Sequence, residues 1–242
     1  TVNQIALALD NAYLFENLSE SFKSCGLAQK KIETYSRSLD QELDKCRQIQ
    51  RDFLPKQLPS LPGWQIEEFF FPATRVSGDF YDAFILPGGY WGLVIGDVCD
   101  KGVGSALFMA LYRSLIRIFS GQARLSRSQV DTQSQTVGGE PDSSSSRHYS
   151  QVEAMRTVAL TNDYIAQDNE MCMFATLFFG VLDPESGKLI YVSGGHETAF
   201  IIDQSGIRES LLPTGPAVGL HPQAKFKYKQ IQLKPGDILF SY

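Results

Sequence analysis

Two aspartates are the residues of this chain whose surroundings fit metal chemistry. Asp79 lies at the start of an apolar stretch, and Asp97 ends another at 91–98, just before a glycine-rich turn at 100–104. An aspartate at the end of a buried strand has rigid backbone and access to solvent, and glycines beside it let an ion approach the main chain. Two such carboxylates on neighbouring strands would bridge a pair of hard divalent cations. Each aspartate taken alone also fits a simple turn, because Asp-Gly sequences mark turns.

The cysteines and histidines narrow the choice of metal. The four cysteines are far apart and form no CxxC pair, and only three histidines are present. A zinc site built from these residue types is therefore disfavoured. Oxygen ligands have to hold any metal, which points to Mg²⁺ or Mn²⁺. The cysteine pattern is typical of reduced thiols in a cytoplasmic protein.

The overall composition excludes several classes of protein. The net charge of −5 argues against a nucleic-acid partner, which would select a basic face. No apolar run approaches the length of a membrane span, and the first residues do not resemble a signal peptide. The hydrophobic content of 43% is sufficient for a large core. We therefore expect a cytoplasmic globular protein with no membrane and no nucleic-acid partner.

The elements that carry the two aspartates are predicted to be short strands. Short runs of aromatic and branched residues predict strands, and two longer runs with helical periodicity predict helices. The Ser-, Gly- and Gln-rich stretch at 121–150 predicts a disordered insertion. Hairpin-connected strands dominate, so the sequence predicts an antiparallel α+β architecture rather than a Rossmann-like one. The predicted strands are 64–71, 80–86, 90–98, 174–182, 189–193 and 199–202, and the predicted helices are 102–120 and 152–166.

A long helix is predicted over residues 1–54, which contain no proline and a single glycine. Apolar residues recur there at three- and four-residue steps, at Ile32, Leu39, Leu43, Cys46 and Phe53. This pattern fits a coiled coil between two copies of the chain, and it fits equally an amphipathic helix packed on its own domain. The three prolines between 55 and 62 end the helix.

Two runs of residues resemble a known family. The runs SGDFYD (77–82) and IGDVCDKGVGSALFMA (95–110) are similar to the first two motifs of the sporulation-E/RsbU branch of the PPM serine/threonine phosphatases. The runs at 174–180, 191–196 and 233–240 fit the later motifs in the same order, and residues 8–16 resemble the last helix of a GAF sensory domain. The resemblance divides the chain into the C-terminal helix of a GAF-like domain (1–20), a helical, coiled-coil linker (21–54) and a phosphatase domain (55–242).

The resemblance implies a fold, a site and a reaction. The fold is an αββα sandwich, in which two packed antiparallel sheets are flanked by helices. The site holds two Mn²⁺ or Mg²⁺ ions, with Asp97 as the bridging carboxylate, the Val98 carbonyl as a ligand and Asp79 as the acidic partner on the adjacent strand. The two ions activate a water that hydrolyses a phosphoserine or phosphothreonine protein. Asp82 is a further candidate, either outside the ligand shell or as a turn cap, and His196 either acts near the phosphate or has a structural role.

The resemblance also implies partners and a departure from the family. The implied substrate is a phosphorylated anti-anti-sigma (STAS) factor, and the helix implies a homodimer. The family places further metal-binding aspartates beyond the strand that here reaches Tyr242, so we expect a domain that is incomplete at its C-terminus and inactive by itself. Asp237 comes too early to replace them and is predicted to be a turn residue.

Two other functions are weighed against a phosphatase. One is a non-catalytic, phosphatase-like module that binds a regulatory partner. The other is a nucleotide-binding enzyme that uses Gly102-Val103-Gly104 as a phosphate loop, which is disfavoured because this stretch lacks the Gly-Lys-Ser/Thr ending of a P-loop.

Overall fold

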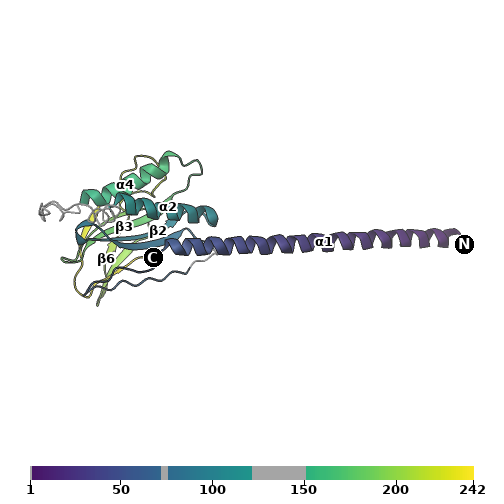
Figure 1. The fold of residues 1–242 in the computed structure, drawn as a ribbon, viewed down its shortest axis with the longest axis horizontal. Helices are drawn as coiled ribbons and strands as arrows, with labels where there is room; N and C mark the ends of the chain where they lie inside the picture. The colour runs from purple at the N-terminus through teal and green to yellow at the C-terminus, as the bar shows by residue number, and fades with distance from the viewer. Residues whose placement is uncertain (1, 72–75, 122–150) are drawn as a thin grey trace, which may run out of the picture. The chain divides into compact units, whose positions relative to one another are not determined.

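The computed structural model describes residues 2–71, 76–121 and 151–242, and its contacts separate Thr1–Cys46 from Arg47–Tyr242. Helix α1 (Val2–Phe53) is continuous over 52 residues (Figure 1). Its described side chains between Val2 and Leu39 are almost all exposed. The helix predicted over 1–54 is therefore confirmed, whereas its division at residue 20 stays a prediction.

The last turn of α1 belongs to the second unit and is anchored there. Gln50 and Leu54 are 4% and 7% exposed, in contrast to the residues before Asp40. The interpretation of a helix that packs on its own domain therefore holds for this last turn. Pairing with a second copy stays a prediction for the exposed part.

The second unit is built around two antiparallel sheets. The five-stranded sheet has the order β1-β2-β3-β4-β7 and the three-stranded sheet has the order β6-β5-β8. The strands are β1 (Asp79–Ile85), β2 (Trp91–Val98), β3 (Ala175–Asp183), β4 (Lys188–Gly194), β5 (Ala199–Asp203), β6 (Gly206–Leu211), β7 (Lys229–Gln232) and β8 (Ile238–Phe240). The 3-10 turn η1 (Pro87–Gly89) joins β1 to β2.

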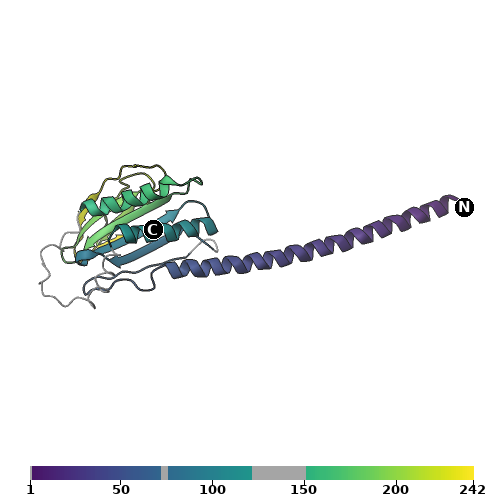
Figure 2. The same cartoon turned by 45° about the horizontal axis from the view of Figure 1, so that its top comes forward.

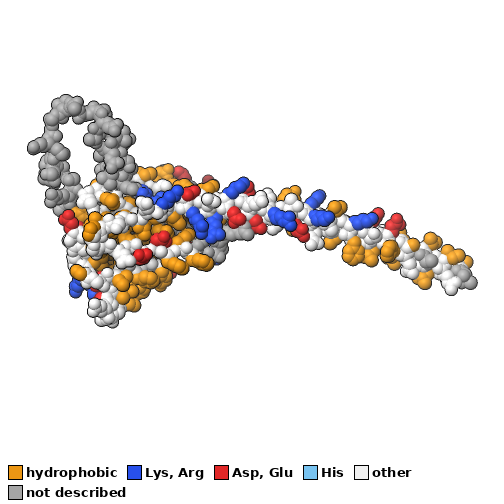
Figure 3. Space-filling view, turned by 60° about the horizontal axis from the view of Figure 1, so that its bottom comes forward, with side chains coloured by type: hydrophobic (Ala, Val, Ile, Leu, Met, Phe, Trp, Pro, Cys, Tyr) orange, Lys and Arg blue, Asp and Glu red, His pale blue; other side chains and the backbone are white. Residues whose placement is uncertain are grey.

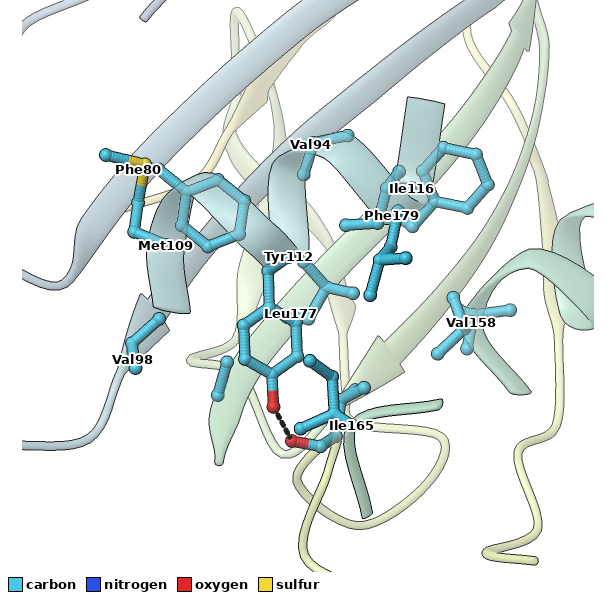
Figure 4. Close-up of a cluster of buried hydrophobic side chains, with 14 of the residues drawn as sticks. Phe80, Val94, Val98, Met109, Tyr112, Ile116, Val158, Ile165, Leu177 and Phe179 are labelled. Carbon is cyan, nitrogen blue, oxygen red and sulfur yellow. Dashed lines mark hydrogen bonds between the residues drawn. The ribbon is translucent and has the colours of Figure 1, made fainter. Parts of the chain in front are cut away.

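Helices α2 (Val103–Phe119) and α4 (Gln151–Gln167) cover one face of the five-stranded sheet (Figures 1 and 2). Phe80, Met109 and Phe179 belong to the apolar layer between these helices and the sheet (Figure 4). Trp91 and Ile201 belong to a second layer, between the two sheets. The predicted α+β sandwich of two antiparallel sheets with a long N-terminal helix is thus confirmed.

The strand predicted at 64–71 was wrong, and the strand at 206–211 was not predicted. Residues 65–71 form no strand, although they are rich in aromatics. Side chains rather than backbone pairing hold this segment, because the Trp64 indole donates to the Pro184 carbonyl at 3.0 Å and Phe70 packs against Tyr81. Strand β6 was missed because Arg208 and its polar neighbours interrupt the apolar alternation.

Two further predictions concern the insertion and the membrane. The predicted insertion at 121–150 lies, apart from Gly121, outside the described residues. Within the described part of the chain, none of the helices combines the length and the hydrophobicity that a membrane crossing requires.

Tyr112 provides a test of how the helical layer is fixed to the sheets. It is fully buried on α2, and its hydroxyl donates to the Val218 carbonyl at 2.6 Å (Figure 4). Tyr112→Phe keeps the ring and removes this hydrogen bond, while the Val218 carbonyl keeps its bond from the Ala175 amide. We expect a loss of about 1 kcal/mol in the free energy of unfolding, measured by urea denaturation. Tyr164→Phe, at a residue that is 58% exposed, should change it by less than about 0.5 kcal/mol; equal losses would contradict the assignment.

Candidate metal and active site

The strand register places Asp79 directly opposite Asp97. Strands β1 and β2 pair antiparallel, with Asp79 against Asp97 and Phe80 against Gly96. Side chains alternate between the two faces of a strand. Phe80 is buried in the layer under the helices, so the carboxylates of Asp79 and Asp97 project from the other face, at the end of the sheet. The register therefore brings together the two aspartates that the sequence singled out.

A pocket of about 470 Å³ opens at these two carboxylates. The backbone that leads from Asp97 turns sharply along the wall of this pocket, with φ of 71° at Asp100 and 93° at Gly102. Such angles suit glycine and, less often, aspartate. Helix α2 begins directly after this turn. The lining residues are Ser77, Gly78, Asp79, Asp97, Val98, Cys99, Asp100 and Lys101.

Gly78 lies against the Val98 carbonyl. A side chain at residue 78 would overlap this oxygen, so only glycine lets the two strands approach as they do. The Val98 amide also donates to the Gly78 carbonyl at 3.3 Å. Val98 also lines the pocket, and the ligand role of its carbonyl, which the family resemblance implies, stays a prediction.

The electrostatics of the pocket favour a cation. Partial burial, together with the charge and the hydrogen bond of Asp79, raises the pKa of Asp97 to about 6. Two adjacent carboxylates repel each other unless a proton or a cation lies between them. Carboxylate and carbonyl oxygens are the ligands that Mg²⁺ and Mn²⁺ prefer, so this donor set fits such an ion. Among the described residues, however, no group of three or more His, Cys, Asp or Glu side chains is placed to hold a metal ion. The assignment of the two aspartates and the Val98 carbonyl as metal ligands therefore stays a prediction.

A short chain of hydrogen bonds connects the pocket to α1. The Ser77 hydroxyl donates to the Asp79 carboxylate at 2.6 Å and accepts from the Asp79 amide at 3.1 Å. Gln50 contacts the backbone of Ser77 twice: its side-chain amide donates to the carbonyl, and its oxygen accepts from the amide at 3.4 Å. Sequence reasoning missed both residues, because their contact joins positions that are 27 residues apart. The feature that identifies this contact is a glutamine that is buried at the end of a helix.

His196 is close to the pocket but buried. Its Nδ1 lies 2.9 Å from the Thr176 hydroxyl, and Thr176 is opposite Asp97 in the register of β2 and β3. Only 5% of the residue is exposed, and its Nε2 has no hydrogen-bond partner among the residues that the structure describes. Burial lowers the pKa of His196. The burial fits the structural alternative better than direct contact with a phosphate group.

Asp82 does not face the pocket. It lies on the opposite face of β1, is 3% exposed, and pairs with Arg113 and Arg117 of α2. The turn-cap interpretation of Asp82 is therefore wrong, because the residue lies in the middle of a strand. The two arginines, four residues apart on an otherwise apolar helix, were the overlooked signal.

Comparison with known proteins agrees with this geometry. The family model described as stage II sporulation protein E (SpoIIE) matches residues 87–242. The chain is 48% identical over 202 residues to Protein IcfG of Synechocystis sp., an alignment that covers 83% of this chain and 32% of that protein. It is 23% identical to the phosphoserine phosphatase RsbU of Bacillus subtilis, over 98% of this chain and 64% of that one. The chain thus spans about one third to just under two thirds of these relatives.

The fold also has a counterpart among solved structures. The PP2C domain of SiaA from Pseudomonas aeruginosa superposes with a TM-score of 0.56 at 18% identity, covering 84% of this chain and 70% of that one. At this identity the likeness concerns the fold, which is that of a PP2C domain. The chain belongs to the SpoIIE family, whose model covers more than half of it.

The raised pKa of Asp97 predicts an unusual dependence of stability on pH. A carboxylate with a raised pKa binds its proton more tightly in the folded state, so stability falls as the pH rises from about 4 to about 6. In the presence of a chelator, Asp97→Asn should therefore raise the melting temperature near neutral pH, and the gain should shrink towards about pH 4.

Asp203→Asn is the matched control, because the expected change in melting temperature near neutral pH has the opposite sign. Hydrogen bonds from Ser205 lower the pKa of its carboxylate, so its contribution to stability is present at neutral pH and is lost as the pH falls below the usual range of an aspartate. Asp203→Asn should lower the melting temperature near neutral pH. An Asp97→Asn protein that melts below the wild type at neutral pH would refute the repulsion between Asp79 and Asp97.

Proposed function

We propose that this chain is the catalytic region of a Mn²⁺- or Mg²⁺-dependent phosphatase that hydrolyses phosphoserine or phosphothreonine in a signalling protein. The observation that carries the proposal is the pair of carboxylates, Asp79 and Asp97, opposite each other in a pocket of a SpoIIE-family domain. That some relatives are named phosphoserine phosphatases supports it.

Each residue of the pocket would have a different role in such a reaction. Bound Mn²⁺ or Mg²⁺, two ions in the complete domain, would supply an activated water and neutralise charge on the phosphoryl oxygens. Asp79, Asp97 and the Val98 carbonyl are the candidate ligands. Ser77 fixes the rotamer of Asp79 by its hydrogen bond, and the exposed ammonium group of Lys101, on the pocket lining, would attract the substrate phosphate.

The link through Gln50 suggests how a signal would reach the site. A rotation of the last turn of α1 would move Ser77 and, through its hydroxyl, the Asp79 carboxylate. Helix α1 would then connect a sensory domain, GAF-like by resemblance, to the metal ligands. The substrate that the family resemblance supports is a phosphorylated STAS-type anti-anti-sigma factor.

One observation favours a non-catalytic alternative. The described residues bring no third acidic, histidine or cysteine side chain to the two aspartates. A domain with so few ligands would bind a phosphoprotein partner without hydrolysing it. Measured turnover separates the two functions.

Phosphate release by the full-length protein tests the proposed activity. We expect Mn²⁺-dependent release from a phosphoserine protein, and we expect Asp97→Asn to lower kcat about 100-fold or more, because a candidate ligand of the ions would be lost. Asp203→Asn, a change of the same type at the end of β5, should leave kcat within about twofold. Phosphate release that continues at the wild-type rate in Asp97→Asn would exclude the assigned role.

The exposed face of α1 is the basis of the proposed homodimer. Leu18, Cys25, Ile32, Leu39 and Cys46 recur every seven residues, and the first four are exposed. Figure 3 shows hydrophobic side chains along this helix, interspersed with charged ones. A seven-residue apolar repeat is the pattern of a left-handed coiled coil. A second copy would cover this column.

Multi-angle light scattering of the full-length protein tests this dimer. We expect a dimer at micromolar concentration and a monomer for Ile32→Asp/Leu39→Asp, because charges replace the apolar seam. Lys30→Gln/Arg37→Gln, at exposed positions outside the column, should remain dimeric. A wild-type monomer, or a dimer that survives the aspartate substitutions, would contradict pairing through this face.

A further inference from the structure

A buried ion cluster joins β1 to α2 on the face of the sheet that points away from the pocket. Arg117 donates two hydrogen bonds to the Asp82 carboxylate, from Nε at 2.5 Å and from Nη2 at 2.7 Å. The Nε of Arg113 lies 2.8 Å from the same carboxylate. The guanidinium of Arg117 also lies over the Phe84 ring, 4.8 Å from its centroid. One carboxylate of an edge strand thus holds two successive turns of a helix.

Joining these two elements through charged side chains carries a cost in desolvation free energy. The Asp82 side chain is 1% exposed and those of Arg113 and Arg117 are 14% and 25% exposed, so all three lose most of their hydration. Apolar residues of similar size often serve a buried contact as well or better. A bidentate arginine–carboxylate pair also fixes the orientation of the two side chains relative to each other. The cluster is therefore suited to setting the position of β1 on α2.

The two joined elements lead to the two candidate metal ligands. Strand β1 begins at Asp79, three residues before Asp82. Helix α2 begins after the short turn that follows Asp97. Among the described strands, β1 pairs only with β2 and ends the five-stranded sheet. The contact with α2 therefore restrains an edge strand whose outer side has no strand partner in the described sheet.

We propose that Asp82 is a positioning residue for the metal site. Its pairs with Arg113 and Arg117 fix β1 against α2, and this sets the spacing of the Asp79 and Asp97 carboxylates and with it the affinity for a divalent ion. The inference rests on the proposed function, because it concerns the ion that the pocket is proposed to hold. Asp82 itself touches neither the ion nor the substrate.

Two readouts on the full-length protein test this role: Mn²⁺ binding by isothermal titration calorimetry and amide hydrogen exchange at residues 79–81. We expect Asp82→Asn to weaken Mn²⁺ binding ~10- to 100-fold, the usual effect of losing a residue that orients a metal ligand. The amides of residues 79–81 should exchange faster, because the start of β1 loses its anchor.

A matched control separates positioning from general destabilisation. Arg208 and Asp237 form a similar ion pair on the three-stranded sheet, with side chains 21% and 4% exposed. Asp237→Asn breaks that pair and should leave Mn²⁺ binding unchanged. Mn²⁺ binding that is weakened equally by Asp82→Asn and Asp237→Asn would overturn the inference.

A second variant keeps the test decisive if Asp82→Asn does not fold. Asp82→Leu/Arg113→Met/Arg117→Met removes all three charges and fills the space with apolar side chains, which preserves stability in comparable clusters. We expect it to fold and to bind Mn²⁺ at least ~10-fold more weakly than the wild type. Wild-type affinity in this variant would overturn the inference alone, whereas a wild-type protein that binds no Mn²⁺ would overturn the proposed function and the inference with it.

Discussion

The repulsion between two neighbouring carboxylates is the constraint around which this domain is arranged. Asp79 and Asp97 are opposite each other in an antiparallel ladder, and the pKa of Asp97 is raised to about 6. Such a pair destabilises a fold unless a cation or a proton offsets it. The structure nevertheless supports this arrangement from several sides. Ser77 orients one carboxylate, Gly78 lets the strands approach, and the turn after Asp97 leaves the pocket open. A divalent ion in the pocket, as proposed above, would offset this repulsion.

Helices α1 and α2 contact the segments that carry Asp79 and Asp97 in different ways. The last turn of α1 is hydrogen-bonded through Gln50 to the backbone of Ser77, which lies beside Asp79. Helix α2 continues from the turn after Asp97 and holds β1 through Asp82. One helix therefore acts on the approach to β1, and the other fixes the strand itself. On the function proposed above, a change at the end of α1 would act on the carboxylates through these hydrogen bonds.

The sequence was sufficient to predict an antiparallel α+β fold, because alternating aromatic and branched residues and short hairpin turns are typical of antiparallel strands. The sandwich of two sheets was implied by the family resemblance. The sequence also singled out Asp79 and Asp97, since both lie at the ends of apolar stretches next to glycines. It could not assign Asp82, because the face on which a strand residue lies depends on the register and on what packs there. Gln50 and Ser77 were missed for a related reason: their hydrogen bonds join residues 27 positions apart. The segment 64–71 was assigned as a strand from its composition, but none of the described strands pairs with it.

A crystal structure of the full-length protein grown with Mn²⁺ tests the central claim most directly. Data collected at the manganese absorption edge locate the ion without reference to any expected geometry. The account predicts an anomalous peak in the pocket, in contact with the carboxylates of Asp79 and Asp97 and with the Val98 carbonyl. A fully loaded crystal whose manganese lies elsewhere, with Asp79 and Asp97 hydrogen-bonded only to each other, would contradict it.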